Sequence, residues 1–201
     1  MNSIINFLSE KYDFQNYLEI GISTGNTIRQ VKCKNKDGVD PQVRCGETNY
    51  GMTSDEFFKT IDSSKKWDVI LIDGLHTHEQ VKKDFENSMF HLNDNGFILI
   101  DDTNPPDEGW THETFRSGGW CGTTYRFIIE LALTNKDIEY FTFNIADGYY
   151  GLTVIRRGHR ELFGDQGNLP NCLNWKYFSD NKQNILNLTT KEKFFDHLNK
   201  L

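Results

Sequence analysis

Acidic and imidazole side chains follow two apolar runs of the sequence. The run "VILID" ends in Asp73, and His76 and His78 come soon after it. The run "FILIDD" ends in Asp101 and Asp102. A carboxylate at the end of a buried strand costs free energy unless a ligand or cation pairs with it. These residues therefore indicate a functional site.

A second group of residues has the spacing of a ligand-binding turn. Glu19, Gly21 and Gly25 predict a tight turn in which the backbone approaches a ligand closely, and Asp40 is spaced to accept hydrogen bonds from ribose hydroxyls. Ser23 stands where dinucleotide-binding proteins have their second glycine, which argues against a dinucleotide. An ordinary strand-to-helix turn is the alternative for the glycines alone.

Length and charge limit the class of protein. The 201 residues fit one domain, or one domain with a short appendage. The net charge of −7 and the lack of a large Lys/Arg cluster argue against nucleic acid or an anionic membrane as partner. A small molecule fits better. We expect the four cysteines to be reduced thiols of a cytoplasmic protein, since no CxxC pair, signal peptide or membrane-spanning run is seen.

Hydrophobic periodicity and turn residues predict the order of the elements. We expect strands at 17–20, 67–72 and 97–100, and a further strand that ends at residue 40. We also expect a weak strand at 45–50 and a hairpin around Asp147 and Gly148. We expect helices near 4–8, after the glycine turn, at 53–61, from Thr77 to Asn95, at 124–133 and at 191–198. Thr53 with Glu56, and Thr77 with Gln80, have capping-box spacing.

This alternation predicts an α/β fold. Continuously apolar strands between helices are typical of a mainly parallel sheet that is covered on both faces, and the hairpin adds an antiparallel strand at an edge. Ligands of such sheets bind at the carboxyl ends of the strands. The acids named above follow successive strands, so we expect them to lie along one rim.

The chain resembles the class I S-adenosylmethionine-dependent methyltransferases, in particular small sugar and natural-product O-methyltransferases. The resemblance rests on "YLEIGISTG", "GVDP", "IDGLHTHEQ", "LIDDTNPP", "GGWCGTTYRFIIELAL" and "GLTVIRRG", and covers about Tyr17 to Gly158. It implies a Rossmann-like, mainly parallel seven-stranded sheet flanked by helices, with a C-terminal antiparallel hairpin. Residues 1–158 are then the methyltransferase domain, and 159–201 a C-terminal extension packed on it.

The resemblance also implies a cofactor site. The methionine and ribose end of S-adenosylmethionine is expected to contact the glycine turn. Its ribose is expected to bind Asp40, and its adenine is expected to lie near the segment before the next helix. The implied cofactor-binding residues are Glu19, Gly21, Ser23, Gly25, Asp40, Met52, Thr53, Ser54 and Asp73.

In similar metal-dependent enzymes, acids at the positions of Asp73, Asp101 and Asp102 hold a divalent cation. Three close carboxylates favour a cation, and all-oxygen ligation suits Mg²⁺, with Mn²⁺ as the other candidate. Several relatives have an acidic base where this chain has Leu75. The role of base is therefore expected to fall to His76, alone or shared with the metal.

The loop between Asp102 and the helix at 124–133 is expected to contact the acceptor. It carries Trp110, His112, Phe115, Arg116 and Trp120. Aromatic rings there can stack on a sugar and Arg116 can hold a phosphate, whereas a packed structural loop is equally compatible with these residues. The acceptor hydroxyl can belong to a sugar, a nucleotide-linked sugar or a natural product, and N-methylation stays open.

Two other functions compete with this one. A metal-dependent nucleotide-sugar glycosyltransferase would use the acids and Asp40, but does not need the glycine turn. A catalytically inactive cofactor-binding protein would bind the cofactor without methyl transfer. A dehydrogenase is least favoured. His78 is expected to be an exposed structural residue, and the aromatic-rich tail from Leu162 to Phe178 could cover a homodimer interface.

Overall fold

The computed structural model describes residues 1–144, 150–164 and 166–200 and contains two compact units. The first unit comprises Met1–Leu75 and Gln80–Leu99. The second comprises His76–Glu79 and the chain from Ile100 onward. The residues expected to do chemistry are therefore divided between two bodies.

Four strands of the first unit lie in the order β2-β1-β3-β4. β1 runs parallel to β2 and to β3, with Tyr17 paired to Lys36 on one side and to Val69 on the other. The elements are α1 (Asn2–Tyr12), β1 (Asn16–Ile20), η1 (Ile28–Gln30), β2 (Asn35–Val39), α2 (Ser54–Thr60), β3 (Trp67–Ile72), α3 (His78–His91) and β4 (Leu92–Ile100).

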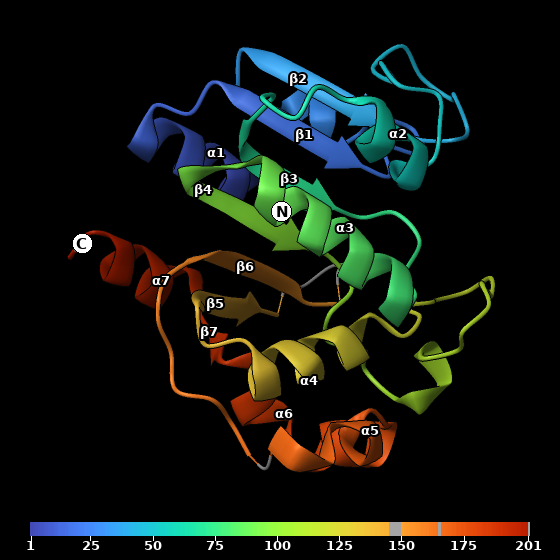
Figure 1. Cartoon of the computed structure of the whole chain (residues 1–201), viewed down its shortest axis with the longest axis vertical. Coiled ribbons are helices and arrows are strands. Elements are labelled where there is room, and N and C mark those ends of the chain that lie inside the picture. The colour runs from blue at the N-terminus through green and yellow to red at the C-terminus, as the bar shows by residue number, and fades with distance from the viewer. Residues whose placement is uncertain (145–149, 165, 201) are drawn as a thin grey trace. The chain divides into compact units, whose positions relative to one another are not determined.

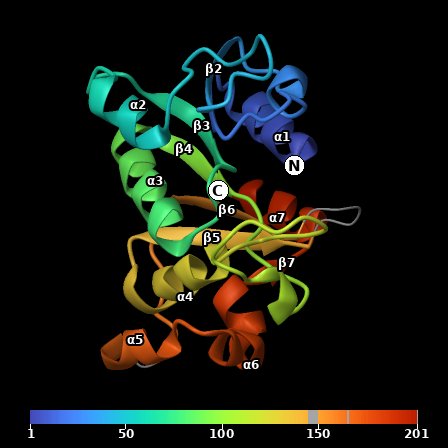
Figure 2. The same ribbon diagram turned by 90° about the vertical axis from the view of Figure 1, so that its right-hand side faces the viewer.

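Helices cover both faces of this sheet. α1 lies on one face, and α2 and α3 lie on the other (Figures 1 and 2). The apolar residues of β3 from Val69 to Ile72 are at most 2% exposed, as expected of a parallel strand buried on both faces. The indole of Trp67 is also buried, and its Nε1–H donates to Oδ2 of Asp37 at 2.8 Å. The polar end of this large ring is thereby satisfied.

Three strands of the second unit lie in the order β6-β5-β7. β5 and β6 are antiparallel and β7 is parallel to β5. The predicted hairpin strands are confirmed, whereas its turn at Asp147 and Gly148 lies outside the described residues. The elements are η2 (Glu108–Trp110), α4 (Thr124–Thr134), β5 (Ile138–Phe143), β6 (Leu152–Arg157), η3 (Gln166–Asn168), α5 (Leu169–Cys172), α6 (Trp175–Leu186), β7 (Leu188–Thr189) and α7 (Lys191–Leu198).

The C-terminal part of the chain packs on both faces of β5. The ring of Phe194 in α7 contacts Phe141 and Phe143, which share one face of the strand. Tyr140 points to the other face, where its hydroxyl donates to the carbonyl of Ile185 at the end of α6. The tail therefore contributes helices and the edge strand β7 to the second unit. The helix α7 was predicted at its observed bounds, whereas α5, α6 and β7 were not predicted.

Three local predictions outside the glycine turn were wrong. α3 ends at His91 rather than at Asn95, because His91 is buried and β4 begins at Leu92. Residues 45–50 form a loop, in which only Tyr50 makes a bridge to Val39. The edge strand beside β5 is β7 and not a strand of the hairpin.

The described residues contain seven strands, as predicted, and in the element order a helix or helical turn lies between every two successive strands except β5 and β6. Within the described part of the chain, no helix is both long and apolar enough to cross a membrane. The predicted boundary between residues 158 and 159 stays a prediction.

Candidate functional site

Glu19 is a buried acid at the end of β1. Its side chain is 1% exposed and accepts a hydrogen bond from the hydroxyl of Tyr17 at 2.7 Å. Burial raises the pKa of Glu19 to about 8; the bond from Tyr17 opposes this rise and the charge of Asp73 adds to it. Glu19 is thus largely protonated at neutral pH, and a cation bound nearby would favour its charged form.

Gly21 lies where the carboxyl ends of three strands meet. Its N–H donates to the carbonyl of Val39 in β2 at 2.8 Å, and the N–H of Asp73 after β3 donates to the carbonyl of Ile20 at 2.9 Å. Gly21 has φ +87°, and a Cβ there would lie 2.1 Å from the carbonyl oxygen of Asp73. Only glycine fits, as expected of a backbone turn built for close approach.

Asp40 is oriented by backbone amides on both sides. The N–H of Ser23, a residue with φ +52°, donates to Oδ2 at 2.8 Å, and the N–H of Gln42 donates to Oδ1 at 2.7 Å. Each carboxylate oxygen keeps a further acceptor position. The glycine turn and the predicted ribose acid are therefore joined directly.

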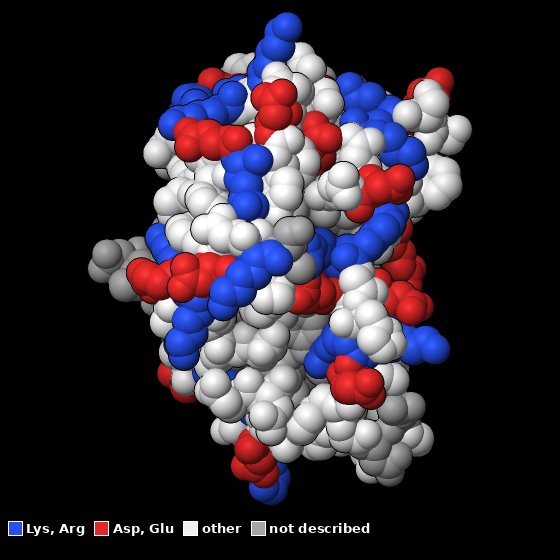
Figure 3. Space-filling model, turned by 90° about the vertical axis from the view of Figure 1, so that its left-hand side faces the viewer, with Lys and Arg blue, Asp and Glu red and all other residues white. Residues whose placement is uncertain are grey.

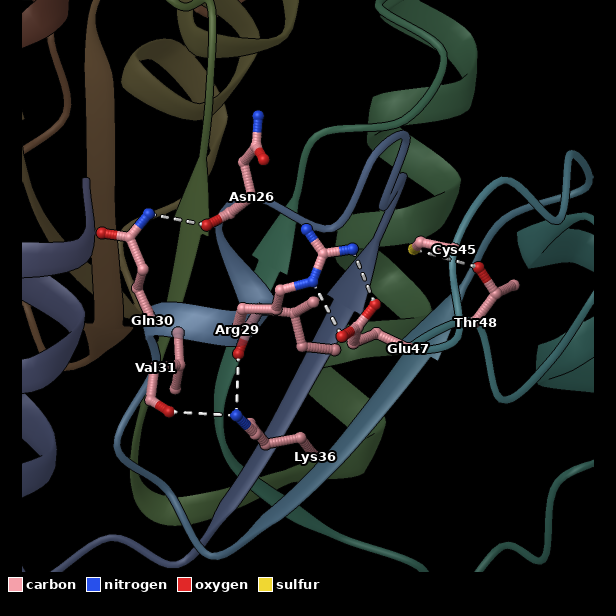
Figure 4. Close-up of polar contacts among 9 residues, drawn as sticks. Asn26, Arg29, Gln30, Val31, Lys36, Cys45, Glu47 and Thr48 are labelled. Carbon is pink, nitrogen blue, oxygen red and sulfur yellow. Dashed lines mark hydrogen bonds and ion pairs between the residues drawn. The ribbon is translucent and has the colours of Figure 1, made fainter.

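Gly25 ends the turn and is enclosed by the loop that follows Asp40. A Cβ on Gly25, whose φ is +77°, would lie 2.9 Å from Sγ of Cys45 and 3.1 Å from atoms of both Arg29 and Glu47. Arg29 donates to Glu47 through Nε at 2.8 Å and Nη2 at 3.0 Å (Figure 4). The sequence reading missed this two-point pair, because it joins two segments without regular structure.

The segment predicted near adenine leads into α2. Thr53 caps the helix in the predicted capping box with Glu56. Nε2 of Gln80 in α3 donates to Oγ of Ser54, Oδ1 of Asp55 and Oδ1 of Asp84, at 3.2, 3.0 and 3.1 Å. Burial raises the pKa of Asp84 to about 6. α3 thus fixes the start of α2, while the contact of Met52, Thr53 and Ser54 with adenine stays a prediction.

In the second unit, His76 lies between an acid and an aromatic ring. Its Nδ1 is 3.0 Å from Oδ2 of Asp102, and both side chains are mostly buried. Trp120 stacks on the imidazole with ring centroids 5.3 Å apart and planes inclined by 17°. Asp102 has φ +55°, a conformation that costs energy in a residue other than glycine and often marks functional sites.

The backbone of His76 is also fixed. Its carbonyl accepts the N–H of Thr123 at 2.8 Å, and a Cβ on Gly122 would lie 1.9 Å from the same oxygen. His78 instead bonds Glu130 of α4 through Nε2 at 2.7 Å. This tie gives His78 a structural role, although its side chain is more buried than predicted.

The predicted substrate loop is packed against itself and exposes some of its side chains. Nε1 of Trp120 donates to the carbonyl of His112 at 2.6 Å. Trp110 contacts Tyr150, with centroids 4.4 Å apart, and covers Gly119. Arg116 is exposed, and so is the ring of Phe115, which meets Trp120 edge to face. Trp110 and Trp120 thus fit a packed structural loop, whereas the exposed Phe115 and Arg116 fit a loop that contacts an acceptor.

The predicted metal ligands belong to different units. Asp73 follows β3 in the first unit, while Asp101 and Asp102 follow β4 in the second. Asp101 is buried, and both acids raise the pKa of the neighbouring Cys121 thiol in addition to its burial. Among residues 1–144, 150–164 and 166–200, no group of three or more His, Cys, Asp or Glu side chains that could hold a metal ion is found. The metal site stays a prediction.

Residues 28–103 match a protein-family model described as a methyltransferase domain. Over these residues the chain is similar to a methyltransferase domain. The match includes Asp40, Asp73, Asp101 and Asp102 and ends beyond β4. It confirms the resemblance inferred from the sequence, and it gives no support to the glycosyltransferase alternative.

Solved structures of methyltransferases share the fold of this chain. An O-methyltransferase from Bacillus cereus, solved with SAH, is 16% identical, with 78% of this chain and 80% of that chain covered and a TM-score of 0.55. The O-methyltransferase TomG from Streptomyces achromogenes, solved with SAM, is 15% identical, with 78% of each chain covered and a TM-score of 0.55.

A third relative was solved with a metal ion. The methyltransferase MycE of the mycinamycin pathway, in complex with Mg, SAH and mycinamycin VI, is 16% identical, with 81% of this chain and 50% of that chain covered and a TM-score of 0.50. No curated protein matches the chain in sequence. At these identities the structures confirm the predicted Rossmann-like α/β fold.

Proposed function

We propose that this protein transfers the methyl group of S-adenosylmethionine to a hydroxyl oxygen of a small-molecule acceptor. The observation that carries the proposal is the meeting of three strand ends at Gly21, with Asp40 fixed beside the turn by the N–H of Ser23. SAM and SAH in structures of the same fold support this choice of cofactor.

The residues of the first unit fit that cofactor. Gly21 and Gly25 have no side chains at the two ends of the turn, and the oriented carboxylate of Asp40 accepts hydrogen bonds from the ribose hydroxyls. Bound S-adenosylmethionine supplies an electrophilic methyl group on a positively charged sulfur. Glu19 is a buried acid whose charged form such a cation stabilises.

His76 is the base in this proposal. An alcohol is a poor nucleophile at neutral pH, so the transfer needs a group that removes the hydroxyl proton while the reacting atoms are held in line. Asp102 lies at Nδ1 of His76 and stabilises the imidazolium that forms, while the stacked indole of Trp120 restricts the ring.

The proposal also includes a divalent cation bound by three aspartates. Asp73, Asp101 and Asp102 are hard oxygen ligands of the kind that Mg²⁺ or Mn²⁺ prefers, and the magnesium in the MycE structure supports a metal in this fold. Bound there, the cation would lower the pKa of the acceptor hydroxyl. It would also compete with His76 for the carboxylate of Asp102, which lies 3.0 Å from the imidazole.

A sugar, a nucleotide-linked sugar or a natural product is the proposed acceptor. Phe115 and Trp120 offer aromatic surface beside His76, and Arg116 and His112 offer polar contacts. Basic and acidic side chains are interspersed on the face drawn in Figure 3, which suits a small acceptor better than a polyanion. A cytoplasmic location and a homodimer belong to the same proposal.

Titration calorimetry with S-adenosylmethionine tests the proposal first. We expect binding with a micromolar dissociation constant, followed by methyl transfer to at least one hydroxyl acceptor in a panel of sugars, UDP- and GDP-sugars and glycosylated natural products. Each assay is run with Mg²⁺ and with EDTA. Binding of a nucleotide sugar without any binding of S-adenosylmethionine would overturn the proposal, and cofactor binding without transfer to any acceptor would favour an inactive binding protein.

A further inference from the structure

The segment after the glycine turn is unusually short of helix. The sequence predicts a turn and a helix there, but only the three residues of η1 (Ile28–Gln30) form a helical turn. A single 3₁₀ turn makes few backbone hydrogen bonds of its own. Its position therefore depends on contacts made by side chains.

Two of these contacts are local. Nε2 of Gln30 donates to the carbonyl of Asn26 at 2.8 Å, and Nζ of Lys36 in β2 donates to the carbonyls of Ile28 and Val31 at 2.9 and 3.2 Å (Figure 4). They satisfy carbonyl groups that a longer helix would have satisfied with its backbone. Neither contact reaches the loop after Asp40.

Arg29 makes the contact that reaches that loop. Its guanidinium pairs with Glu47 at two points, the geometry in which arginine and a carboxylate bind best. The ion pair lies against Gly25, since a Cβ on that residue would be 3.1 Å from both partners. Cys45 of the same loop also lies against Gly25, since a Cβ there would be 2.9 Å from its Sγ. This Sγ is 3.7 Å from Oγ1 of Thr48.

We propose that Arg29 and Glu47 form a clamp that positions the cofactor site, by holding the glycine turn against the loop that follows the ribose acid Asp40. The inference rests on the proposed function, because it names S-adenosylmethionine as the ligand of that site. Arg29 and Glu47 are positioning residues. They act through the turn and through Asp40, which the turn already contacts by way of Ser23.

Because the pair is partly exposed, its effect on the cofactor site can be distinguished from an effect on the free energy of folding. The side chains of Arg29 and Glu47 are 47% and 32% exposed, and exposed ion pairs contribute little to the free energy of folding. Losing the clamp lowers the fraction of molecules in which turn and loop are joined. Because an exposed pair is weak, its loss raises the dissociation constant for the cofactor by no more than about fivefold.

Four variants and a matched control test the clamp. Arg29→Ala and Glu47→Ala should each weaken S-adenosylmethionine binding about two- to fivefold in calorimetry, with thermal midpoints within about 3 °C of the wild type. The exchange Arg29→Glu with Glu47→Arg should bind more tightly than Arg29→Glu alone. The control is Lys32→Ala, which removes a more exposed ion pair, the one with Glu10, and should leave the affinity unchanged.

The outcomes separate the clamp from the proposed function. Wild-type affinity in both alanine variants overturns the clamp, and so does an exchange variant as weak as Arg29→Glu, since that result assigns the effect to Arg29 alone. A wild-type protein that does not bind S-adenosylmethionine overturns the proposed function itself.

Discussion

The imidazole of His76 and the carboxylate of Asp102 lie 3.0 Å apart, although they come from different segments of the second unit. His76 precedes α3, and Asp102 follows β4 in a left-handed backbone conformation. The pair places an acid and a titratable ring together beside Trp120. Such a pair is suited to proton removal from an acceptor.

Replacing His76 tests its role as base. His76→Ala should lower kcat for methyl transfer by about 10²- to 10⁴-fold, the usual contribution of a general base, and leave the affinity for S-adenosylmethionine unchanged. His78→Ala is the control, because His78 bonds Glu130 and should affect stability by about 1 kcal/mol rather than kcat. Equal loss of activity in both variants would contradict the assignment.

The turn at Gly21 should tolerate no side chain. Gly21→Ala combines a positive φ with a Cβ 2.1 Å from the carbonyl oxygen of Asp73, and should lower the free energy of unfolding by on the order of 3 kcal/mol. Gly46→Ala is the control, since a Cβ there meets nothing within 4 Å. Urea unfolding of both variants measures the difference, and similar values for the two would argue against a close-packed turn.

Glu19 should make stability depend on pH. Its pKa is raised from 4.5 to about 8 in the folded protein, so the folded state binds more protons than the unfolded state between these values, and stability falls as pH rises through this window. Glu19→Gln should remove that loss, which is on the order of 3 kcal/mol between pH 5 and pH 8. Urea unfolding at both pH values checks this. If wild type and variant lose equal stability, the slope comes from other groups, such as Asp84.

Trp120 should matter for the acceptor and not for the cofactor. Trp120→Ala removes the ring that stacks on His76, and should lower kcat/KM for the acceptor by about 10- to 100-fold because the base loses its fixed orientation. The affinity for S-adenosylmethionine should not change. Phe90→Ala serves as the control, since Phe90 is a 59% exposed ring in the first unit. An unchanged kcat/KM in Trp120→Ala would make the loop purely structural.

The sequence predicted well those elements whose residues carry their own signal. β3 was predicted at its observed bounds because the run from Trp67 to Ile72 is continuously apolar, and the capping box of Thr53 and Glu56 marked the start of α2. The glycines of the first turn were recognised by spacing, and the structure gives Gly21 and Gly25 the positive φ that such a turn needs.

Other features depend on contacts that no local pattern encodes. β7 has two residues and forms only because β5 lies beside it. α3 ends four residues early because β4 extends back to Leu92. The pair of Arg29 and Glu47 joins irregular segments, and the pair of His76 and Asp102 joins residues that were assigned separate roles as base and metal ligand.

The three hydrogen bonds of Gln80 restrict how this chain can evolve. One amide group holds Ser54 and two carboxylates, those of Asp55 and Asp84. Replacing Gln80 with an acid would add a third carboxylate beside Asp55 and Asp84, and replacing it with an apolar residue would remove one of the hydrogen bonds to the buried Asp84. Positions 55, 80 and 84 should therefore vary together among homologous sequences, so that the first turn of α2 and the first turns of α3 change in step.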